Sequence, residues 1–559
     1  MHSIWRVHPA HPEQARELAG PLGIHPLTAQ LLLNREVTTL QEAARFLRPG
    51  LDALGDPWEL PDMGRAVDRL RQAAADAEPI LIFGDSDVDG LTASVILYEV
   101  LRGRGAVVRA RQSNRILDGY GLPPRLAQQL GRSSSGLLIL VDCGTNQPEE
   151  VRQLAAKGIE TVIVDHHVPL DGWARPHALV NPHRAAAAGH GLCSAGLAFK
   201  MAQALLGAEA PERLAASLDL AALGTLADCS PLVGESRVIV SAGLARIVNS
   251  RRPGLRRLCD ATGTTEPNPD QVVRRLVPRL NASGRLGDAA AVWHLLRDED
   301  DGRLEERLAA VEAAHTATKQ LHRQVIAEAE EQVSRLHFRD QLVMVVGRSG
   351  WPQGLMGPLA SRLAERYGRP AIAMAFDGER GVGSGRSVPH VNLFEVLRSC
   401  RELLVRFGGH AQACGLTVER KHVERFRELV NQHARRSLGP EGLTRTRAID
   451  LELPLKRVAP GWVEEAARFA PFGHGNPRPT VAIRGLALEA KSPRTAMLSD
   501  GTMRVAAKGP FSTGLAAEGA PGSRGRYDVV ASPVILAGQL VLSVSDVRVS
   551  AAPSEPAPT

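Results

Sequence analysis

Residues 80–90 read Ile-Leu-Ile-Phe-Gly-Asp-Ser-Asp-Val-Asp-Gly, a short apolar run that ends in three alternating carboxylates. Two later apolar runs end similarly: residues 137–141 are followed by Asp142, and residues 161–164 by Asp-His-His. Apolar runs of this length are typical of buried parallel strands. Because sites in open α/β sheets form at the carboxyl ends of strands, we expect these acidic and imidazole groups to meet in one crevice.

The alternation of apolar runs with helical stretches predicts an α/β fold with a parallel, doubly wound sheet. Further along, residues 303–338 are highly charged and contain neither Pro nor Gly, which predicts one long helix. Short alternating runs with Gly and Pro turns near the end predict a β-barrel. We therefore expect six segments: a helical cap (1–75), the doubly wound domain (76–302), a connecting helix (303–338), a smaller α/β domain (339–440), the barrel (441–549) and a disordered tail (550–559).

Composition limits the class of protein. Of the 559 residues, 44% are hydrophobic and 23% are charged, and no apolar run is long enough to span a bilayer. The start of the chain lacks the basic-then-apolar order of a signal peptide, so we expect a cytoplasmic protein. The six cysteines form no CxxC pair, which argues against a zinc knuckle or a disulfide framework. The net charge of +6 permits a nucleic-acid partner.

The acidic loop at 85–90 has two alternative interpretations without catalysis: a calcium-binding loop or a solvated turn. A calcium loop of the helix–loop–helix type needs a Glu twelve positions into a loop that starts at Asp85, where Ile96 stands, and it needs flanking helices rather than a preceding strand. Three carboxylates ending a buried strand would repel one another, and a divalent cation is the natural remedy. Carboxylates mixed with imidazole suit manganese, with magnesium or cobalt as alternatives, better than zinc.

Four segments together resemble the motifs of the DHH phosphoesterases, in the family's order. They are Gly84-Asp-Ser-Asp-Val-Asp-Gly90, Val141-Asp-Cys-Gly-Thr-Asn146, Asp165-His-His167 and Gly224-Thr-Leu-Ala-Asp228. The resemblance implies a phosphodiesterase that works with two Mn²⁺ or Mg²⁺ ions. One departure is Ser86, where the family commonly carries a bulkier residue, so local packing is expected to differ.

The same resemblance implies six metal ligands, with one of them shared between both ions. These ligands are Asp85, Asp87, Asp89, Asp142, His166 and Asp228. Asp87 and Asp142, with Asp85 nearby, would hold one ion, and the remaining ligands with Asp142 would hold the other. His167 would face the scissile phosphate, and Asp165 would orient the histidines. The residues expected to act in catalysis are Asp142, His166, His167 and Arg285.

Further segments resemble the RecJ exonucleases within that superfamily. They are 113–115, 119–122 and 277–286 in the first α/β domain, and 383–387 and 408–413 in the second, which resembles a DHH-associated domain. The resemblance implies hydrolysis of single-stranded DNA from 5′ to 3′, releasing 5′-mononucleotides in recombination and repair. It implies that the following residues bind substrate phosphates or backbone: Arg115, Arg279, Asn281, Arg285, Ser384, Arg386 and His410.

The C-terminal barrel resembles the OB-type domain of these exonucleases, but residues 478–559 contain only two aromatic residues, Phe511 and Tyr527. OB folds usually grip single strands by base stacking. We therefore expect this barrel either to bind DNA by arginine–phosphate contacts, with strong salt dependence, or to serve a partner protein. Single-stranded DNA-binding protein and a helicase are the expected protein partners, and the chain is expected to be monomeric.

Two other functions stay open at this point. The first is a DHH hydrolase of short oligoribonucleotides or cyclic dinucleotides, against which the cap and the barrel argue. The second is a non-catalytic DNA-binding scaffold, against which the complete set of expected metal ligands argues.

Overall fold

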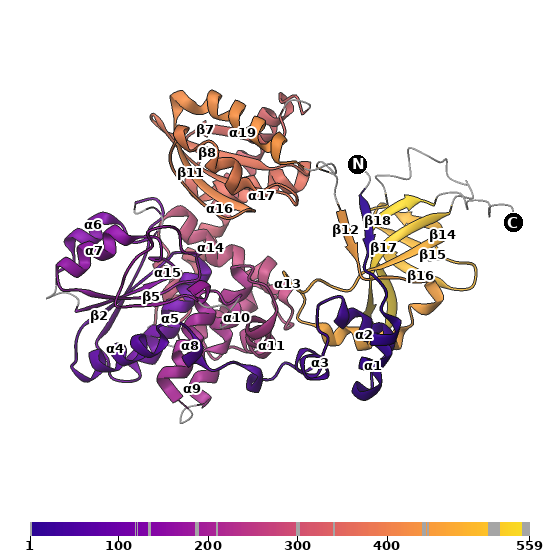
Figure 1. Ribbon diagram of the computed structural model, residues 1–559, viewed down its shortest axis with the longest axis horizontal. Helices are drawn as coiled ribbons and strands as arrows, with labels where there is room; N and C mark the ends of the chain where they lie inside the picture. Colours follow the sequence, from indigo (N-terminus) through magenta and orange to yellow (C-terminus); the bar gives the residue numbers. More distant parts are fainter. Residues whose placement is uncertain are drawn as a thin grey trace. The chain divides into compact units, whose positions relative to one another are not determined.

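The computed structural model describes residues 3–117, 119, 121–131, 136–184, 189, 191–207, 211–297, 302–338, 341–438, 443, 446–511 and 526–550. Contacts divide the chain into two compact units (Figure 1). One unit is Leu54–Thr444, and the other combines Met1–Ala53 with Arg445–Thr559. The predicted disordered tail lies outside the described residues from position 551 onward.

A five-stranded parallel sheet organises the first part of the larger unit. Its order is β3-β2-β4-β5-β6. The strands are β2 (Ile80–Gly84), β3 (Val108–Gln112), β4 (Leu137–Val141), β5 (Glu160–Val164) and β6 (Ala178–Val180). Gly84 pairs with Val141, and Val141 pairs with Val164. The three strands that precede the acidic motifs therefore end side by side.

Helices cover both faces of this sheet (Figure 1). Successive side chains along each strand point to opposite faces, and both faces are buried. Ile80 and Ile82 join one core, together with α4 (Met63–Ala75), α5 (Val88–Arg102), α8 (Ser194–Leu206) and α10 (Leu218–Ala227). Phe83, Leu138 and Leu140 point to the opposite core, with α6 (Pro124–Gln129) and α7 (Pro148–Ala156). The predicted doubly wound fold is confirmed.

The rest of this part is helical. Its elements are η3 (Pro182–Arg184), α9 (Pro211–Ala215), α11 (Gly234–Val248), α12 (Pro253–Thr262), α13 (Pro269–Gln271), η5 (Val272–Leu276), α14 (Val277–Leu286) and α15 (Ala290–Leu295). The predicted long helix is α16 (Leu304–Ser334), whose buried residues Val311, Thr318 and Val325 recur every seven positions. That spacing places one narrow stripe of an otherwise charged helix against its neighbours.

The second α/β part of this unit is a five-stranded mixed sheet of order β10-β11-β9-β8-β7, in which only β7 and β8 are parallel. Its strands are β7 (Met344–Ser349), β8 (Ala371–Asp377), β9 (Arg380–Arg386), β10 (Leu404–Gly409) and β11 (Ala413–Glu419). Its helical elements are η6 (Gln353–Leu355), α17 (Met356–Tyr367), α18 (Leu393–Arg398), η7 (Arg401–Leu403), η8 (Arg420–His422) and α19 (Val423–Ser437).

The smaller unit contains the predicted barrel. Its sheet has the order β13-β14-β15-β16-β18-β17, and pairing of β14 with β17 closes it. The strands are β13 (Leu451–Glu452), β14 (Val481–Ser492), β15 (Thr495–Ser499), β16 (Arg504–Lys508), β17 (Tyr527–Leu536) and β18 (Gln539–Val549). Its helical elements include η9 (Leu455–Arg457), α20 (Pro460–Ala466) and η10 (Ala467–Phe469).

The N-terminal segment 1–75, predicted as a single helical cap, divides between the two units. The short strand β1 (Ile4–Val7) pairs with β12 (Thr446–Ile449). The helices α1 (Pro12–Leu22), α2 (Pro26–Leu33) and α3 (Leu40–Leu47) contribute apolar residues to the barrel core. By contrast, α4 joins the core of the parallel sheet, because Met63, Val67 and Leu70 are buried there. Two short turns, η1 (Leu51–Ala53) and η2 (Pro57–Glu59), lie between these groups.

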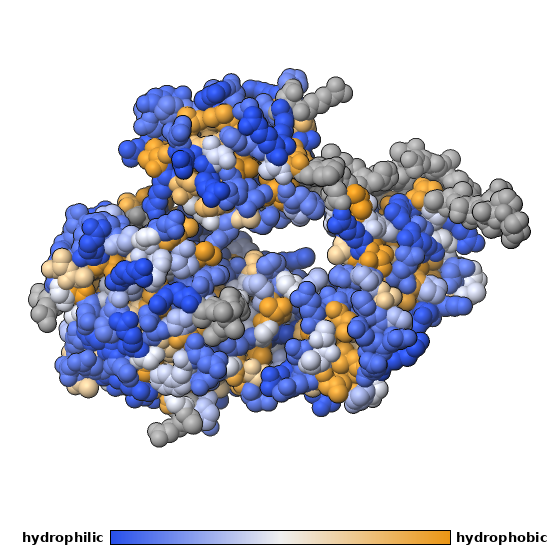
Figure 2. Space-filling model, in the orientation of Figure 1, coloured by the Kyte–Doolittle hydropathy of each residue, from blue (hydrophilic) through white to orange (hydrophobic). Residues whose placement is uncertain are grey.

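Surface character agrees with the composition. Hydrophilic residues predominate on the face drawn in Figure 2, with hydrophobic ones scattered between them. Among the described helices, none is both long enough and apolar enough to cross a membrane. Five of the six cysteines are buried, and the exposed one is Cys229.

Candidate metal centre and phosphate-binding residues

The carboxyl ends of β2, β4 and β5 bring the predicted ligands together with the end of α10. We call the group Asp85, Asp87, Asp89, Asp142, His166 and Asp228 the carboxylate–histidine cluster. Two sets within it, which share no residue, each place their ligand atoms within 4.8 Å of one another: Asp85 with Asp87 and Asp142, and Asp89 with His166 and Asp228. Asp142 links the sets, because its Oδ1 lies 3.4 Å from His166 Nε2.

The first motif forms a tight turn into α5. Asp87 is the N-cap of this helix, and its Oδ1 accepts a hydrogen bond of 3.2 Å from the Gly90 amide. A Cβ at Gly90 would lie 2.7 Å from the Asp85 carbonyl oxygen, so only glycine lets the helix start this close to the strand end. The turn thereby points successive carboxylates toward one place.

Asp142 has a left-handed backbone with φ of 61°, directly after β4. This conformation is unusual for a residue other than glycine and is often found where function imposes it. The Asp142 amide donates to the Val164 carbonyl at 3.0 Å, which ties the turn to the adjacent strand end. The side chain at the centre of the cluster is thus held by backbone as well as by its neighbours.

The start of α8 holds two side chains of the cluster by hydrogen bonds. The sequence did not predict this contribution. The amides of Ser194 and Ala195 donate to the two carboxylate oxygens of Asp89 at 2.9 and 2.8 Å. The Ser194 hydroxyl donates to Asp142 Oδ1 at 2.9 Å. A helix N-terminus stabilises negative charge, so α8 orients two ligands at once.

The two adjacent histidines differ in their partners. His166 faces the cluster through Nε2, whereas His167 Nδ1 lies 2.7 Å from Asp165 Oδ1. The other Asp165 oxygen accepts from the Thr145 amide at 3.1 Å. Burial acts to lower the pKa of His167, but Asp165 more than offsets this and raises it above the usual value. Asp165 therefore orients His167 and favours its charged form.

Raised carboxyl pKa values show that the negative charges in the cluster are not fully balanced by its own side chains. Burial and the neighbouring Asp228 carboxylate raise the pKa of Asp89 to about 6. Burial, Asp87 and Asp89 raise the pKa of Asp142 well above its usual value. Burial acts on Asp85 in the same direction, but Arg115 and the hydrogen bonds from Ser113 and Ser86 together outweigh it, and the pKa of Asp85 is lowered.

Arg115 already places a cation beside part of the cluster. Its Nη2 lies 2.6 Å from Asp85 Oδ2 and 3.2 Å from Asp87 Oδ2. A guanidinium group at this point, and raised carboxyl pKa values at Asp89 and Asp142, fit a centre that binds divalent cations. The oxygen and imidazole donors suit Mn²⁺ or Mg²⁺.

A second group of predicted residues converges at the start of α17. The Ser384 hydroxyl and the Arg386 Nη2 both lie 3.8 Å from the point that a Cβ on Gly357 would occupy. Gly357 is the second residue of α17 and has no side chain, so the Ser384 hydroxyl and the Arg386 guanidinium border an open space there. A hydroxyl and a guanidinium together can bind phosphate. Arg386 also lies within electrostatic reach of Cys229, next to Asp228.

Arg285 and His410 lie within electrostatic range of the cluster. Burial lowers the pKa of Arg285, Arg115 lowers it further and Asp87 opposes this. Burial likewise lowers the pKa of His410, and His167 and His166 contribute. His410 is exposed, as expected for a residue that contacts a strand of nucleic acid.

Two predicted substrate contacts have other partners in the structure. Arg279 Nε donates to Glu312 on α16 at 2.6 Å, and its Nη1 donates to the Arg275 carbonyl at 2.7 Å. Asn281 Oδ1 accepts a hydrogen bond of 3.1 Å from the Val88 amide. Asn281 thus holds the start of α5, and Arg279 fastens α14 to the long helix.

Comparisons with known proteins agree with one another over most of the chain. Residues 79–225 match the DHH family, N-terminal domain, residues 340–436 the DHHA1 domain, and residues 449–498 the RecJ OB domain. Over 492 residues the chain is 34% identical to the single-stranded-DNA-specific exonuclease RecJ of Dickeya dadantii, covering 82% of this chain and 84% of that protein.

Two further relatives define the extent of the match. The chain is 34% identical over 491 residues to the RecJ of Bacillus subtilis, covering 87% of this chain but spanning only 62% of that relative's length. The crystal structure of RecJ in complex with Mn²⁺ from Thermus thermophilus aligns with a TM-score of 0.82 at 28% identity, covering 98% of this chain and 80% of that one. This chain belongs to the RecJ family of DHH-domain proteins.

Proposed function

We propose that this chain is a 5′-to-3′ exonuclease specific for single-stranded DNA, which releases 5′-mononucleotides in recombination and repair. The carboxylate–histidine cluster is the observation that carries the proposal, because its two sets of ligands suit hydrolysis with two cations. The names of the curated relatives, single-stranded-DNA-specific exonucleases, support the choice of substrate.

Asp85, Asp87 and Asp142 would hold one Mn²⁺ or Mg²⁺ ion, and Asp89, Asp142, His166 and Asp228 would hold the other. When bound, such a pair of cations lowers the pKa of a water molecule and neutralises charge on the phosphate. The part of this chain is to orient the ligands, which the α8 amides do for Asp89 and the Ser194 hydroxyl does for Asp142.

Three side chains of this chain would act on the phosphate. Asp165 holds His167 through Nδ1, and Nε2 would donate to a phosphate oxygen. Arg115 now pairs with Asp85 and Asp87, and it would turn to the substrate once cations neutralise these carboxylates. Arg285 would add a further donor to the phosphates.

Ser384 and Arg386, beside the start of α17, would hold the terminal 5′-phosphate, and His410 would contact the next part of the strand. Arg386 lies within electrostatic reach of Cys229, next to Asp228, so a 5′-phosphate bound there would present the strand to the cluster one nucleotide at a time. Arg279 and Asn281 would act indirectly, through their bonds to Glu312 and to the start of α5.

The proposal extends to the setting in which the enzyme works. The chain would act as a monomer in the cytoplasm, with single-stranded DNA-binding protein and a helicase as partners. The RecJ OB domain match supports a nucleic-acid role for the barrel. Light scattering of the purified chain tests the monomer, and an excess of dimer would contradict it.

A single assay tests the activity. The purified chain is incubated with Mn²⁺ and single-stranded DNA labelled at the 3′ end, with or without a 5′-phosphate. The expected result is a descending ladder of labelled products that forms faster with the 5′-phosphate and is absent in Asp142→Ala.

Other outcomes would replace the proposal. Immediate release of labelled mononucleotide would reverse the polarity. Cleavage of short oligoribonucleotides or cyclic dinucleotides, with long DNA left intact, would assign the chain to the other DHH hydrolases. Tight binding of DNA without any cleavage would indicate a scaffold.

A further inference from the structure

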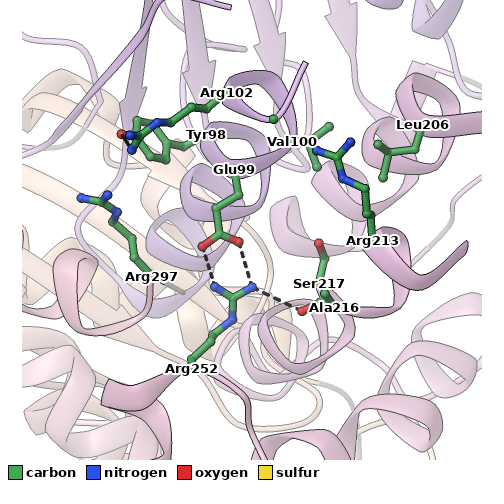
Figure 3. A pocket seen from close by; sticks show the side chains of 11 residues that line it. Tyr98, Glu99, Val100, Arg102, Leu206, Arg213, Ala216, Ser217, Arg252 and Arg297 are labelled. Carbon is green, nitrogen blue, oxygen red and sulfur yellow. Dashed lines mark hydrogen bonds and ion pairs between the residues drawn. The ribbon is translucent and has the colours of Figure 1, made fainter. Parts of the chain in front are cut away.

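A pocket of about 490 Å³ lies at the C-terminal end of α5 (Figure 3). Its walls come from α5, α8, α9 and the segments around Arg252 and Arg297. The carboxylate–histidine cluster lies at the other end of α5. From Asp89 to Glu99 the helix rises about 15 Å, at 1.5 Å per residue. A ligand in this pocket would therefore not touch the cluster.

An ion pair lines the pocket. Arg252 donates to both oxygens of Glu99, at 2.7 and 2.9 Å, and its Nε donates to Asp219 at 3.1 Å. Arg252 is buried, and two carboxylates compensate its charge. This pair is therefore a structural part of the wall, and a ligand must be recognised by other groups.

Three further arginines line the same pocket: Arg102, Arg213 and Arg297. Figure 3 shows Arg213 and Arg297 on opposite sides of the Glu99–Arg252 pair, with Arg102 beside Tyr98. Two of them contact neighbouring side chains. Arg102 donates to the Tyr98 hydroxyl at 3.0 Å, and Arg297 lies 3.4 Å from a ring nitrogen of His294.

Arg213 is the arginine best placed for a ligand. It is exposed, and no hydrogen bond or ion pair joins its guanidinium to another residue in the described part of the chain. Its Nη2 lies only 2.0 Å from the point that a Cβ on Gly103 would occupy, so the guanidinium reaches across to the end of α5. A guanidinium in this position can bind a phosphate with two hydrogen bonds.

Part of the remaining wall is apolar or aromatic: Val100, Leu206 and the half-buried Tyr98. The volume falls in the range of pockets for small organic ligands, which combine an apolar wall with a few polar groups. A nucleotide matches both parts, because its phosphates suit the Arg213 guanidinium and its base and sugar suit the other walls. We propose that this pocket binds a small nucleotide through its phosphates, at a site separate from the carboxylate–histidine cluster.

The test is calorimetric titration of the full-length protein with dADP in the presence of a chelator, which keeps divalent cations from the cluster. Saturable binding is expected. Arg213→Glu should lower the affinity at least about tenfold, because it replaces attraction by repulsion. Arg16→Glu, an equal charge change on the exposed side of α1, should leave it unchanged.

A second variant keeps the test independent of charge. Ala216 is exposed at the pocket wall, so Ala216→Phe should fill the space and weaken binding to a similar degree. Unchanged binding in both variants would overturn the proposal. Loss of binding in Arg386→Ala instead would also overturn it, because it would place the nucleotide at α17.

The absence of saturable binding would likewise overturn the proposal and leave Arg213 as a cap for the end of α5. Pyrophosphate binding as tight as that of dADP would overturn the nucleoside part of the proposal.

Discussion

The two ends of α5 carry opposite charges. The helix begins with Asp87 and Asp89 in the carboxylate–histidine cluster and ends with Arg102 at the arginine-lined pocket. The sign of the charge at each end agrees with the helix dipole, which favours anions at the N-terminus and cations at the C-terminus. Other elements then add more charge of the same sign, Asp142 and Asp228 at one end and Arg213 at the other. Each end therefore suits a ligand of opposite charge.

The charged groups at the start of α5 are more deeply buried than those at its end. Asp85, Asp89 and Asp142 are at most 3% exposed, whereas Arg102 and Arg213 are exposed. Charges interact more strongly where water is excluded. Changes at the start of α5 should therefore have large effects on activity, and changes at its end should have smaller effects on binding alone.

The largest effect is expected from Asp142→Asn. The side chain links the two sets of ligands, so its loss should lower exonuclease activity by at least about 10³-fold. Binding of dADP to the chelated protein should stay within about twofold of the unsubstituted chain. Loss of both properties would show that the two ends of α5 are not independent.

Arg252→Met should have the largest effect on stability. It leaves Asp219 buried and Glu99 partly buried without their cation, which should lower the free energy of unfolding by about 3–5 kcal/mol. The matched change Arg257→Met breaks an exposed pair with Glu305 and should lower the free energy of unfolding far less, because water screens that pair. Urea unfolding measures both, and equal losses would contradict the structural role of the Arg252 network.

Arg386→Ala should reduce cleavage of 5′-phosphorylated strands by about 10–100-fold, because one phosphate donor at α17 is lost. Strands that lack the 5′-phosphate should be affected much less. The ratio of the two rates at subsaturating DNA is the measurement. An equal loss on both substrates would place Arg386 outside the terminal-phosphate pocket.

Mn²⁺ affinity should depend on pH through Asp89. A carboxyl with a pKa of about 6 takes up a proton as the pH falls through that value, and the proton competes with the cation. Affinity should therefore fall on going from pH 7.5 to 5.5, by up to about tenfold per pH unit below 6. A pH-independent affinity would contradict ligation by Asp89.

Much of this arrangement could be predicted from the sequence, because the information is local. Each of the three apolar runs ends in a carboxylate, and parallel strands must align their ends, so the meeting of Asp85, Asp142 and His166 follows from the pattern. The long helix could be predicted for a similar reason, since residues 303–338 lack any breaker.

What could not be predicted depends on contacts between distant segments. Nothing in the sequence around Ser194 indicates that the start of α8 binds Asp89, which lies 105 residues earlier. Arg279 has a motif typical of phosphate contact, yet Glu312 on α16 binds it. The left-handed backbone of Asp142 is equally hidden, because aspartate gives no signal of the kind that glycine does.

The number of Mn²⁺ ions bound per chain is the most direct test of the carboxylate–histidine cluster. Equilibrium dialysis of the purified protein at pH 7.5 should find two ions per chain, and Asp142→Ala should bind fewer than one at the same free concentration. Two ions bound equally by the protein and the variant, or none bound by either, would contradict the assignment of these six residues as the metal centre.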